Sequence, residues 1–150
     1  MIAYLDLDFV LRLVVKSSVS SQIARIIAPI PAPYRLTWWH VCQVEDILQR
    51  QAAQGDASVR AAAKEARLEW RHHLDEMIFD PQPAQWDAAM IQAARLASQW
   101  TEGDLPVPGL LLHPACAAAS GFTHFVSLHL PLRRAAKLCH LQVLPEKWKG

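Results

Sequence analysis

Short apolar runs alternate with longer stretches of helical periodicity along this chain. The first run, within Met1–Leu13, predicts a strand whose C-terminal end delivers Asp6, and Tyr34–Thr37 predicts a second strand. Near the C-terminus, Gly121 is a stop signal after a helix of small residues, and a short buried strand follows it. A polar turn, a further helix and a final strand complete the pattern.

The predicted helices are longer than the strands. Trp38–Gln54 predicts one helix, and a long middle helix begins at Asp56 or Ser58 as its N-cap and ends at the proline-bearing segment Asp80–Pro83. Ala88–Thr101 predicts another helix with one apolar face. Because strands that alternate with helices form parallel sheets, the sequence predicts an α/β fold with a short, mostly parallel sheet flanked by helices on both faces.

Polar side chains follow two of the predicted strands directly. Asp6 follows the first strand, and His129 lies in the turn after the strand near the C-terminus. In parallel α/β sheets the reactive groups gather beyond the carboxyl ends of the strands. We therefore expect Asp6 and His129 to share one cleft.

The composition is that of one globular domain, residues 1–150. The chain is 52% hydrophobic and 19% charged, and 150 residues can bury a core without disulfides. Charged residues interrupt the longest apolar run, and the N-terminal segment lacks the pattern of a secretory signal, so we expect a cytoplasmic protein without a membrane span. The one long polar, proline-bearing loop covers residues 102–109.

The cysteines and the net charge argue against three other classes of protein. Cys42, Cys116 and Cys139 are widely spaced, which favours buried thiols over a disulfide framework or a zinc ribbon. The net charge of +1 lacks the strongly basic balance of a non-specific duplex binder. Any contact with RNA must therefore be local.

Several short motifs follow one another in an order that resembles PIN-domain proteins, in particular the VapC-type toxin ribonucleases. Tyr4-Leu5-Asp6 is similar to the opening strand of this family, and His113 and Ala115 match its segment Leu-Asp-x-x-His-x-Ala. The run Ser120–His129 is similar to the family's last helix end, strand and turn. The resemblance implies a three-layer α/β/α fold, Mg²⁺-dependent or Mn²⁺-dependent cleavage of RNA, a homodimer and an antitoxin-type protein partner.

The chain departs from this family at most of its acidic positions. It retains Asp6, but Gln43 stands in place of the family's Glu, Leu110 in place of the third acid and His129 in place of the fourth. Mg²⁺ and Mn²⁺ require several oxygen ligands. Each lost carboxylate removes an attraction of about 4 kcal/mol at 4 Å and an effective dielectric constant of 20, before desolvation is counted. Three losses should abolish tight Mg²⁺ binding.

A reduced metal site is the alternative. Asp8 lies two residues after Asp6, and His129 would favour Mn²⁺, Ni²⁺ or Zn²⁺ over Mg²⁺ because imidazole is a softer donor. Asp46 shares a helix face with Gln43. Each residue also has a structural interpretation: Asp8 as a helix cap, and His129 as a solvent-facing side chain. His113, in an apolar segment, is interpreted as a packed core histidine.

Two basic clusters are candidates for local contacts with RNA. The cluster within residues 60–73 is interleaved with Glu65 and Glu69, which is typical of a solvated helix face. Arg133, Arg134 and Lys137 follow the altered turn, where PIN nucleases present basic residues to the RNA backbone. The tryptophans are too scattered to predict a base-stacking platform, and we assign them to packing or an interface.

Two functional hypotheses follow. In the first, the ribonuclease site has degenerated, and the protein acts by binding RNA or a protein partner. In the second, the protein still cleaves RNA with a metal held by Asp6, Asp8 and His129. The sequence leaves open whether the chain is an enzyme.

Overall fold

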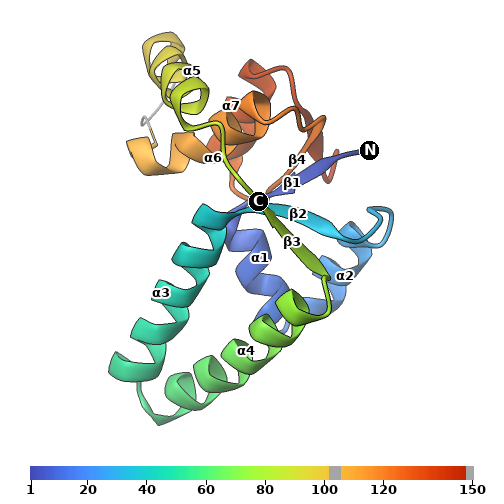
Figure 1. Ribbon diagram of the computed structural model, residues 1–150, viewed down its shortest axis with the longest axis vertical. Coiled ribbons are helices and arrows are strands. Elements are labelled where there is room, and N and C mark those ends of the chain that lie inside the picture. The colour runs from blue at the N-terminus through green and yellow to red at the C-terminus, as the bar shows by residue number, and fades with distance from the viewer. Residues whose placement is uncertain (102–105, 148–150) are drawn as a thin grey trace. The chain divides into compact units, whose positions relative to one another are not determined.

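The computed structural model describes residues 1–101 and 106–147. Residues 102–105 of the predicted polar loop, and Trp148, lie outside these ranges. The chain forms two compact units: unit 1 comprises Met1–Asp6 and Pro83–Gly150, and unit 2 comprises Leu7–Gln82 (Figure 1). In the described ranges no helix combines the length and the apolar character needed to cross a bilayer.

Unit 1 contains a parallel sheet of three short strands. The strands are β1 (Ala3–Leu5), β4 (His124–Val126) and β5 (Gln142–Leu144), in the order β1-β4-β5. All three run in the same direction, with Leu5 opposite Val126 and Val126 opposite Leu144. Their carboxyl ends therefore lie along one edge of the sheet. The helices of this unit are α5 (Trp86–Gln99), α6 (Pro108–Ala119) and α7 (Leu130–Leu138).

Aromatic rings and small residues fill the core of unit 1. The Tyr4 ring stacks on Phe125 with centroids 5.6 Å apart and meets Phe122 edge-on at 5.2 Å. Ala115, Cys116 and Ala117 of α6, and Ala135 and Ala136 of α7, are buried in the same cluster. These small side chains let the helices approach the short strands closely, so three-residue strands can still form a well-packed sheet.

Gly121 ends α6 as the sequence predicts. Its φ of +75° is in the left-handed region that favours glycine. The Phe122 N–H donates to the Ala117 carbonyl at 3.0 Å, and the Gly121 N–H donates to the Ala118 carbonyl at 3.3 Å. This pair of bonds is a Schellman motif, which turns the chain directly from α6 toward β4.

Unit 2 is built around a pair of long helices. α3 (Trp38–Gln54) and α4 (Ala57–Asp75) pack side by side and are joined by a tight turn (Figure 1). Asp56 caps α4 by accepting a 2.9 Å hydrogen bond from the Val59 N–H. The remaining elements are α1 (Leu7–Val14), α2 (Ser20–Ile27), β2 (Tyr34–Thr37) and β3 (Phe79–Gln82), and β2 pairs with β3 in parallel.

The structure confirms an α/β fold with short parallel strands and differs from the predicted elements at three points. The segment at Asp80–Pro83, predicted to end a helix, overlaps strand β3, whereas α4 already ends at Asp75. Pro81 is compatible with this strand because β2 is the only described neighbour of β3, so one of its edges makes no sheet bonds. Helix α2 was not predicted. The strands of the described ranges also divide between two sheets, one in each unit.

Candidate functional site

The carboxyl edge of the unit 1 sheet begins with Asp6. This residue follows β1 immediately, and its N–H donates a 3.0 Å hydrogen bond to the Val126 carbonyl. The side chain of Asp6 is completely buried. The apolar strand Ala3–Leu5 thus holds a carboxylate at the point where the three strands end, as the sequence predicts.

The turn after β4 forms the second part of this edge. The Ser127 N–H donates to the Leu144 carbonyl at 3.1 Å, which continues the pairing of β4 with β5. The Ser127 hydroxyl accepts a hydrogen bond of 3.0 Å from the His129 N–H, so this turn is closed by a side chain. His129 itself is the N-cap residue of α7 and is exposed, consistent with its interpretation as a solvent-facing side chain.

Arg133 is the side chain that joins the parts of this edge. Its Nη1 atom donates to the carbonyl oxygens of Ser127 at 2.7 Å and Leu144 at 3.0 Å, and its Nη2 atom donates to the carbonyl oxygen of Pro145 at 2.5 Å. Arg133 is only 7% exposed. The guanidinium group therefore satisfies main-chain carbonyls at the ends of β4 and β5, which their own sheet does not use.

Asp6 and Arg133 also interact electrostatically. Burial lowers the pKa of the Arg133 guanidinium, and the nearby Asp6 carboxylate opposes this by raising it. Arg133 thus lies within electrostatic range of Asp6, the acid that matches the pattern of the similar family.

The cation near Asp6 bears on the Mg²⁺ or Mn²⁺ site that the family resemblance implies. Mg²⁺ and Mn²⁺ gain affinity from a cluster of anionic oxygens, and a nearby guanidinium opposes the approach of a second cation. In residues 1–101 and 106–147, no three His, Cys, Asp or Glu side chains come together as a metal-binding group. The use of Mg²⁺ or Mn²⁺ stays a prediction of the family resemblance.

The other predicted site residues have different surroundings. Leu110, at the third acidic position, packs against the core of unit 1 from α6. In unit 2, Asp8 lies in the first turn of α1 and forms an ion pair of 2.7 Å with Arg12 one turn later. Asp46 pairs in the same way with Arg50 at 2.8 Å.

Gln43, at the family's glutamate position, lies on α3 in unit 2 and is half-buried. The candidate catalytic positions, which are the three residues of the reduced site and Gln43 at the glutamate position, therefore divide between the units: Asp6 and His129 belong to unit 1, and Asp8 and Gln43 belong to unit 2.

His113 is a core residue, as the sequence predicts. It is 1% exposed, and its Nδ1 atom lies 3.1 Å from the hydroxyl oxygen of Tyr4. The two rings meet at 66° with centroids 6.1 Å apart. This contact joins α6 to β1, so His113 serves the packing of unit 1.

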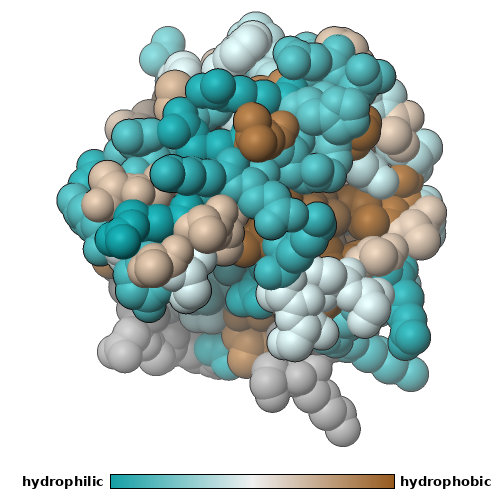
Figure 2. Space-filling view, turned by 90° about the horizontal axis from the view of Figure 1, so that it is seen from below, coloured by the Kyte–Doolittle hydropathy of each residue, from teal (hydrophilic) through white to brown (hydrophobic). Residues whose placement is uncertain are grey.

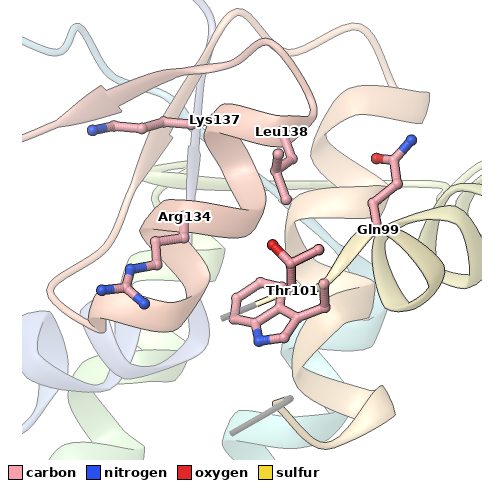
Figure 3. Close-up of a pocket in the computed structure, with 6 residues that line it drawn as sticks. Gln99, Thr101, Arg134, Lys137 and Leu138 are labelled. Carbon is pink, nitrogen blue, oxygen red and sulfur yellow. The ribbon is translucent and has the colours of Figure 1, made fainter. Parts of the chain in front are cut away.

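The basic residues of α7 have two different roles. Arg133 faces inward and is committed to the carbonyls, whereas Arg134 and Lys137 are exposed. Arg134 and Lys137 line a hollow of about 300 Å³ between the end of α5 and the second half of α7 (Figure 3). We call it the α5–α7 hollow, and its lining residues are Gln99, Trp100, Thr101, Arg134, Lys137 and Leu138. The sequence did not predict that Trp100 and the basic residues share a site, because they lie on different helices.

The basic cluster of α4 is a mixed-sign helix face, as predicted. Arg67 and Arg71 lie 3.5 and 4.0 Å from the carboxylate of Glu45, and His73 lies 3.1 Å from Glu69. Figure 2 shows one face of the protein, on which hydrophilic residues surround smaller hydrophobic areas. The acids next to the α4 cations reduce their attraction for an RNA backbone.

We compared the chain with protein-family models, curated proteins and solved structures. None of them matches.

Proposed function

We propose that this chain is a PIN-like protein, related to the VapC-type toxin ribonucleases, that has lost metal-dependent catalysis and acts by binding RNA. The order of its motifs supports a three-layer PIN-like fold. The observation that supports the loss of catalysis is Arg133, which is buried within electrostatic range of Asp6, the one acid that matches the family pattern.

The position of Arg133 near Asp6 supports the loss of the metal. In a nuclease of this kind the cation balances the clustered acids and activates a water molecule. Here the cation near Asp6 is a guanidinium, and its Nη donors are used by three carbonyls. A guanidinium cannot be deprotonated under physiological conditions and cannot supply a bound hydroxide. In this proposal, Arg133 stabilises the carboxyl edge of the unit 1 sheet but does not supply metal-dependent cleavage of RNA.

RNA is the partner favoured by the exposed charges. Arg134 and Lys137 lie one turn apart on α7 and line the α5–α7 hollow. Such cations contact phosphates and position a strand without reading its sequence. Because Arg133 is committed to the main chain, we assign phosphate contacts to Arg134 and Lys137 alone. A homodimer and an antitoxin-type partner remain proposals from the family resemblance.

A calorimetric titration with Mn²⁺ and Mg²⁺, on the protein and on Asp6→Asn, tests the loss of catalysis. We expect no saturable binding at millimolar metal and no cleavage of RNA by either protein. Saturable binding together with cleavage, both lost in Asp6→Asn, would instead establish the active enzyme with a reduced site.

RNA binding is tested separately by fluorescence anisotropy with a labelled single-stranded oligoribonucleotide. We expect Arg134→Glu combined with Lys137→Glu to weaken binding at least about tenfold, because two phosphate contacts are reversed in sign. Lys64→Glu, together with Arg60→Glu, makes the same change of charge on α4 and should have a smaller effect. Equal losses in the two double variants would contradict the assigned site, and a protein that ignores RNA but binds a second protein would contradict RNA as the partner.

A further inference from the structure

Helix α5 exposes large apolar side chains on the side that faces away from the core of unit 1. The helix packs on α6 (Figure 1), and its buried residues are Ala89 and Leu96. At about 100° of rotation per residue, Ile91 lies on the other side of the helix from both. Ile91 is 56% exposed, and the adjacent Met90 is 58% exposed. Covering these side chains with another surface would remove apolar area from water, which is favourable.

Two opposite charges flank Ile91 at equal spacing along α5. Asp87 precedes Ile91 by four residues and Arg95 follows it by four, so the three side chains lie along one side of the helix. Both charged residues are exposed. Within residues 1–101 and 106–147, neither of them takes part in an ion pair. Both charges can therefore contact another molecule.

The order of these charges matches a second copy of the same helix. When two copies of α5 lie antiparallel and cross at Ile91, Asp87 of one copy faces Arg95 of the other, and two-fold symmetry repeats the contact. A parallel pair in register would instead bring like charges together, which is unfavourable. The antiparallel arrangement also places the positive N-terminus of each helix beside the negative C-terminus of its partner. The charge pattern of α5 is thus complementary to itself in one orientation.

Small side chains on either side of Ile91 allow the two helices to approach closely. Ala88 and Ala94 are both exposed, and in the antiparallel pair Ala88 of one copy faces Ala94 of the other. Each Ile91 can then insert between residues of the facing helix, as in knobs-into-holes packing. The contact would have an apolar centre with a charged pair at each end, which is the usual composition of an interface core and its rim.

We propose that α5 mediates a symmetric, antiparallel homodimer of this chain, with Ile91 at its centre and Asp87 of each protomer paired with Arg95 of the other. The homodimer that the family resemblance implies thereby gains a defined surface, which depends on neither RNA binding nor Asp6. A single pair of 14-residue helices is smaller than a standard interface of about 800 Å² per partner. The dimer should therefore be reversible and dissociate on dilution.

Sedimentation velocity of the full chain, from low micromolar to near-millimolar concentration, tests the dimer. We expect a monomer–dimer equilibrium that shifts toward monomer at high salt, because salt screens the exposed charge pairs. Ile91→Ser should weaken the dimer at least about tenfold, because it removes the apolar centre. Asp87→Arg and Arg95→Asp should each weaken it by a similar factor, because like charges then face each other.

A mixture of the two charge variants is the decisive measurement. Asp87→Arg has two positive charges on this face and Arg95→Asp has two negative charges, so each variant repels itself and attracts the other. We expect the mixture to form a heterodimer, detected by native mass spectrometry, at concentrations where each variant alone is a monomer. A folding defect in either variant could not produce this gain of association.

Two controls address changes that are not specific to this surface. Leu68→Ser removes a side chain of α4 that is 70% exposed, and it should leave the equilibrium unchanged. Thermal melting followed by circular dichroism should show Ile91→Ser to be about as stable as the parent, because Ile91 is exposed.

The outcomes separate this surface from the proposed function. A chain that stays monomeric at every concentration, or a dimer that ignores Ile91→Ser and both charge variants, would overturn the α5 dimer. A mixture of the charge variants that stays monomeric would overturn the pairing of Asp87 with Arg95. RNA binding, measured by fluorescence anisotropy, should persist in Ile91→Ser. A parent protein that dimerises through α5 but ignores RNA would support the dimer and contradict the proposed function alone.

Discussion

The Nη1 atom of Arg133 lies 2.7 Å from the main-chain oxygen of Ser127, the first residue after β4. This bond connects the first half of α7 to the turn that precedes it. The same guanidinium donates to the carbonyls of Leu144 and Pro145 at the end of β5. One side chain therefore holds both the turn before α7 and the end of the strand after it. Arg133 is therefore a structural residue although it belongs to the most basic helix of unit 1.

Replacing Arg133 should destabilise the protein strongly. Arg133→Ala leaves the carbonyls of Ser127 and Pro145 without this donor and removes the cation near Asp6, for which we expect a loss of about 3 kcal/mol in the free energy of unfolding. Arg133→Lys should recover only part of this, because an ammonium group cannot reproduce the planar fork. Urea unfolding measures both. Arg134→Ala is the matched control and should change stability by less than about 0.5 kcal/mol; equal losses at the two positions would contradict this role.

Replacing Gly121 should cost stability through the backbone alone. No atom lies within 4 Å of the position that a Cβ would occupy, so Gly121→Ala creates no clash, but its φ of +75° is unfavourable for alanine. We expect a loss of about 1 kcal/mol in the free energy of unfolding. Gly109→Ala is the control, because this glycine lies in α6 with open space around it and alanine favours a helix. A stabilising Gly121→Ala would contradict the expectation.

Asp56 should stabilise α4 in a pH-dependent way. The Val59 N–H and the Ser58 hydroxyl hold the pKa of Asp56 below its ordinary value of 3.8. A carboxylate with a lowered pKa contributes stability that is complete above the ordinary value and is lost as the pH falls through the folded-state pKa. Asp56→Ala should therefore lower the melting temperature at pH 7, and the difference from the parent should shrink below pH 3.8. Asp56→Asn, which keeps an acceptor, should retain most of the stability. A difference that is independent of pH would contradict the contribution of the charge.

Cys116 should make the protein less stable in alkali. Burial raises the pKa of this thiol from 9.0 to about 11. Between these values the unfolded chain loses its thiol proton while the folded chain keeps it, so the free energy of unfolding should fall as the pH rises, by at most about 1.4 kcal/mol per pH unit from this group. Urea unfolding from pH 8 to pH 10.5 measures the effect, and the comparison with Cys116→Ala isolates it. A stability difference between the two proteins that stays constant with pH would rule it out.

Thiol labelling offers an independent check on the same core. Cys42 is exposed on α3, whereas Cys116 and Cys139 are buried in unit 1 and have raised pKa values. The thiolate is the reactive form, so iodoacetamide at pH 8 should modify Cys42 first and the other two only on unfolding. Mass spectrometry of the partly labelled protein gives the order of reaction. Early modification of Cys116 would mean that the core of unit 1 opens readily.

Local signals predicted part of the fold from the sequence. The bounds of β2 and α3 agree with the prediction, as do the cap at Asp56 and the stop at Gly121. Each depends on a few neighbouring residues: a switch from alternating to helical periodicity, a capping side chain or a glycine that adopts a positive φ. Such features are decided within one turn of the chain.

The parts that were not predicted depend on distant contacts. Pro81 suggested an interruption, and only the pairing of β3 with β2 makes this segment a strand. Arg133 was grouped with Arg134 and Lys137 by charge, although Leu132, Ala135 and Ala136 place its side of α7 against the core. That apolar spacing was a signal available in the sequence. The carbonyls that fix the guanidinium are not encoded in side chains and could not be predicted.

The sheet of unit 1 also sets the order in which the protein can form during translation. β1 pairs with β4, and the partners Ala3 and His124 are 121 residues apart, whereas both strands of unit 2 lie within Leu7–Gln82. A ribosome will therefore have released every residue of unit 2 while β1 still lacks its neighbour. During that interval the nascent chain exposes an apolar strand whose hydrogen bonds are unmade, and an unpaired strand of this kind is prone to pair with other chains.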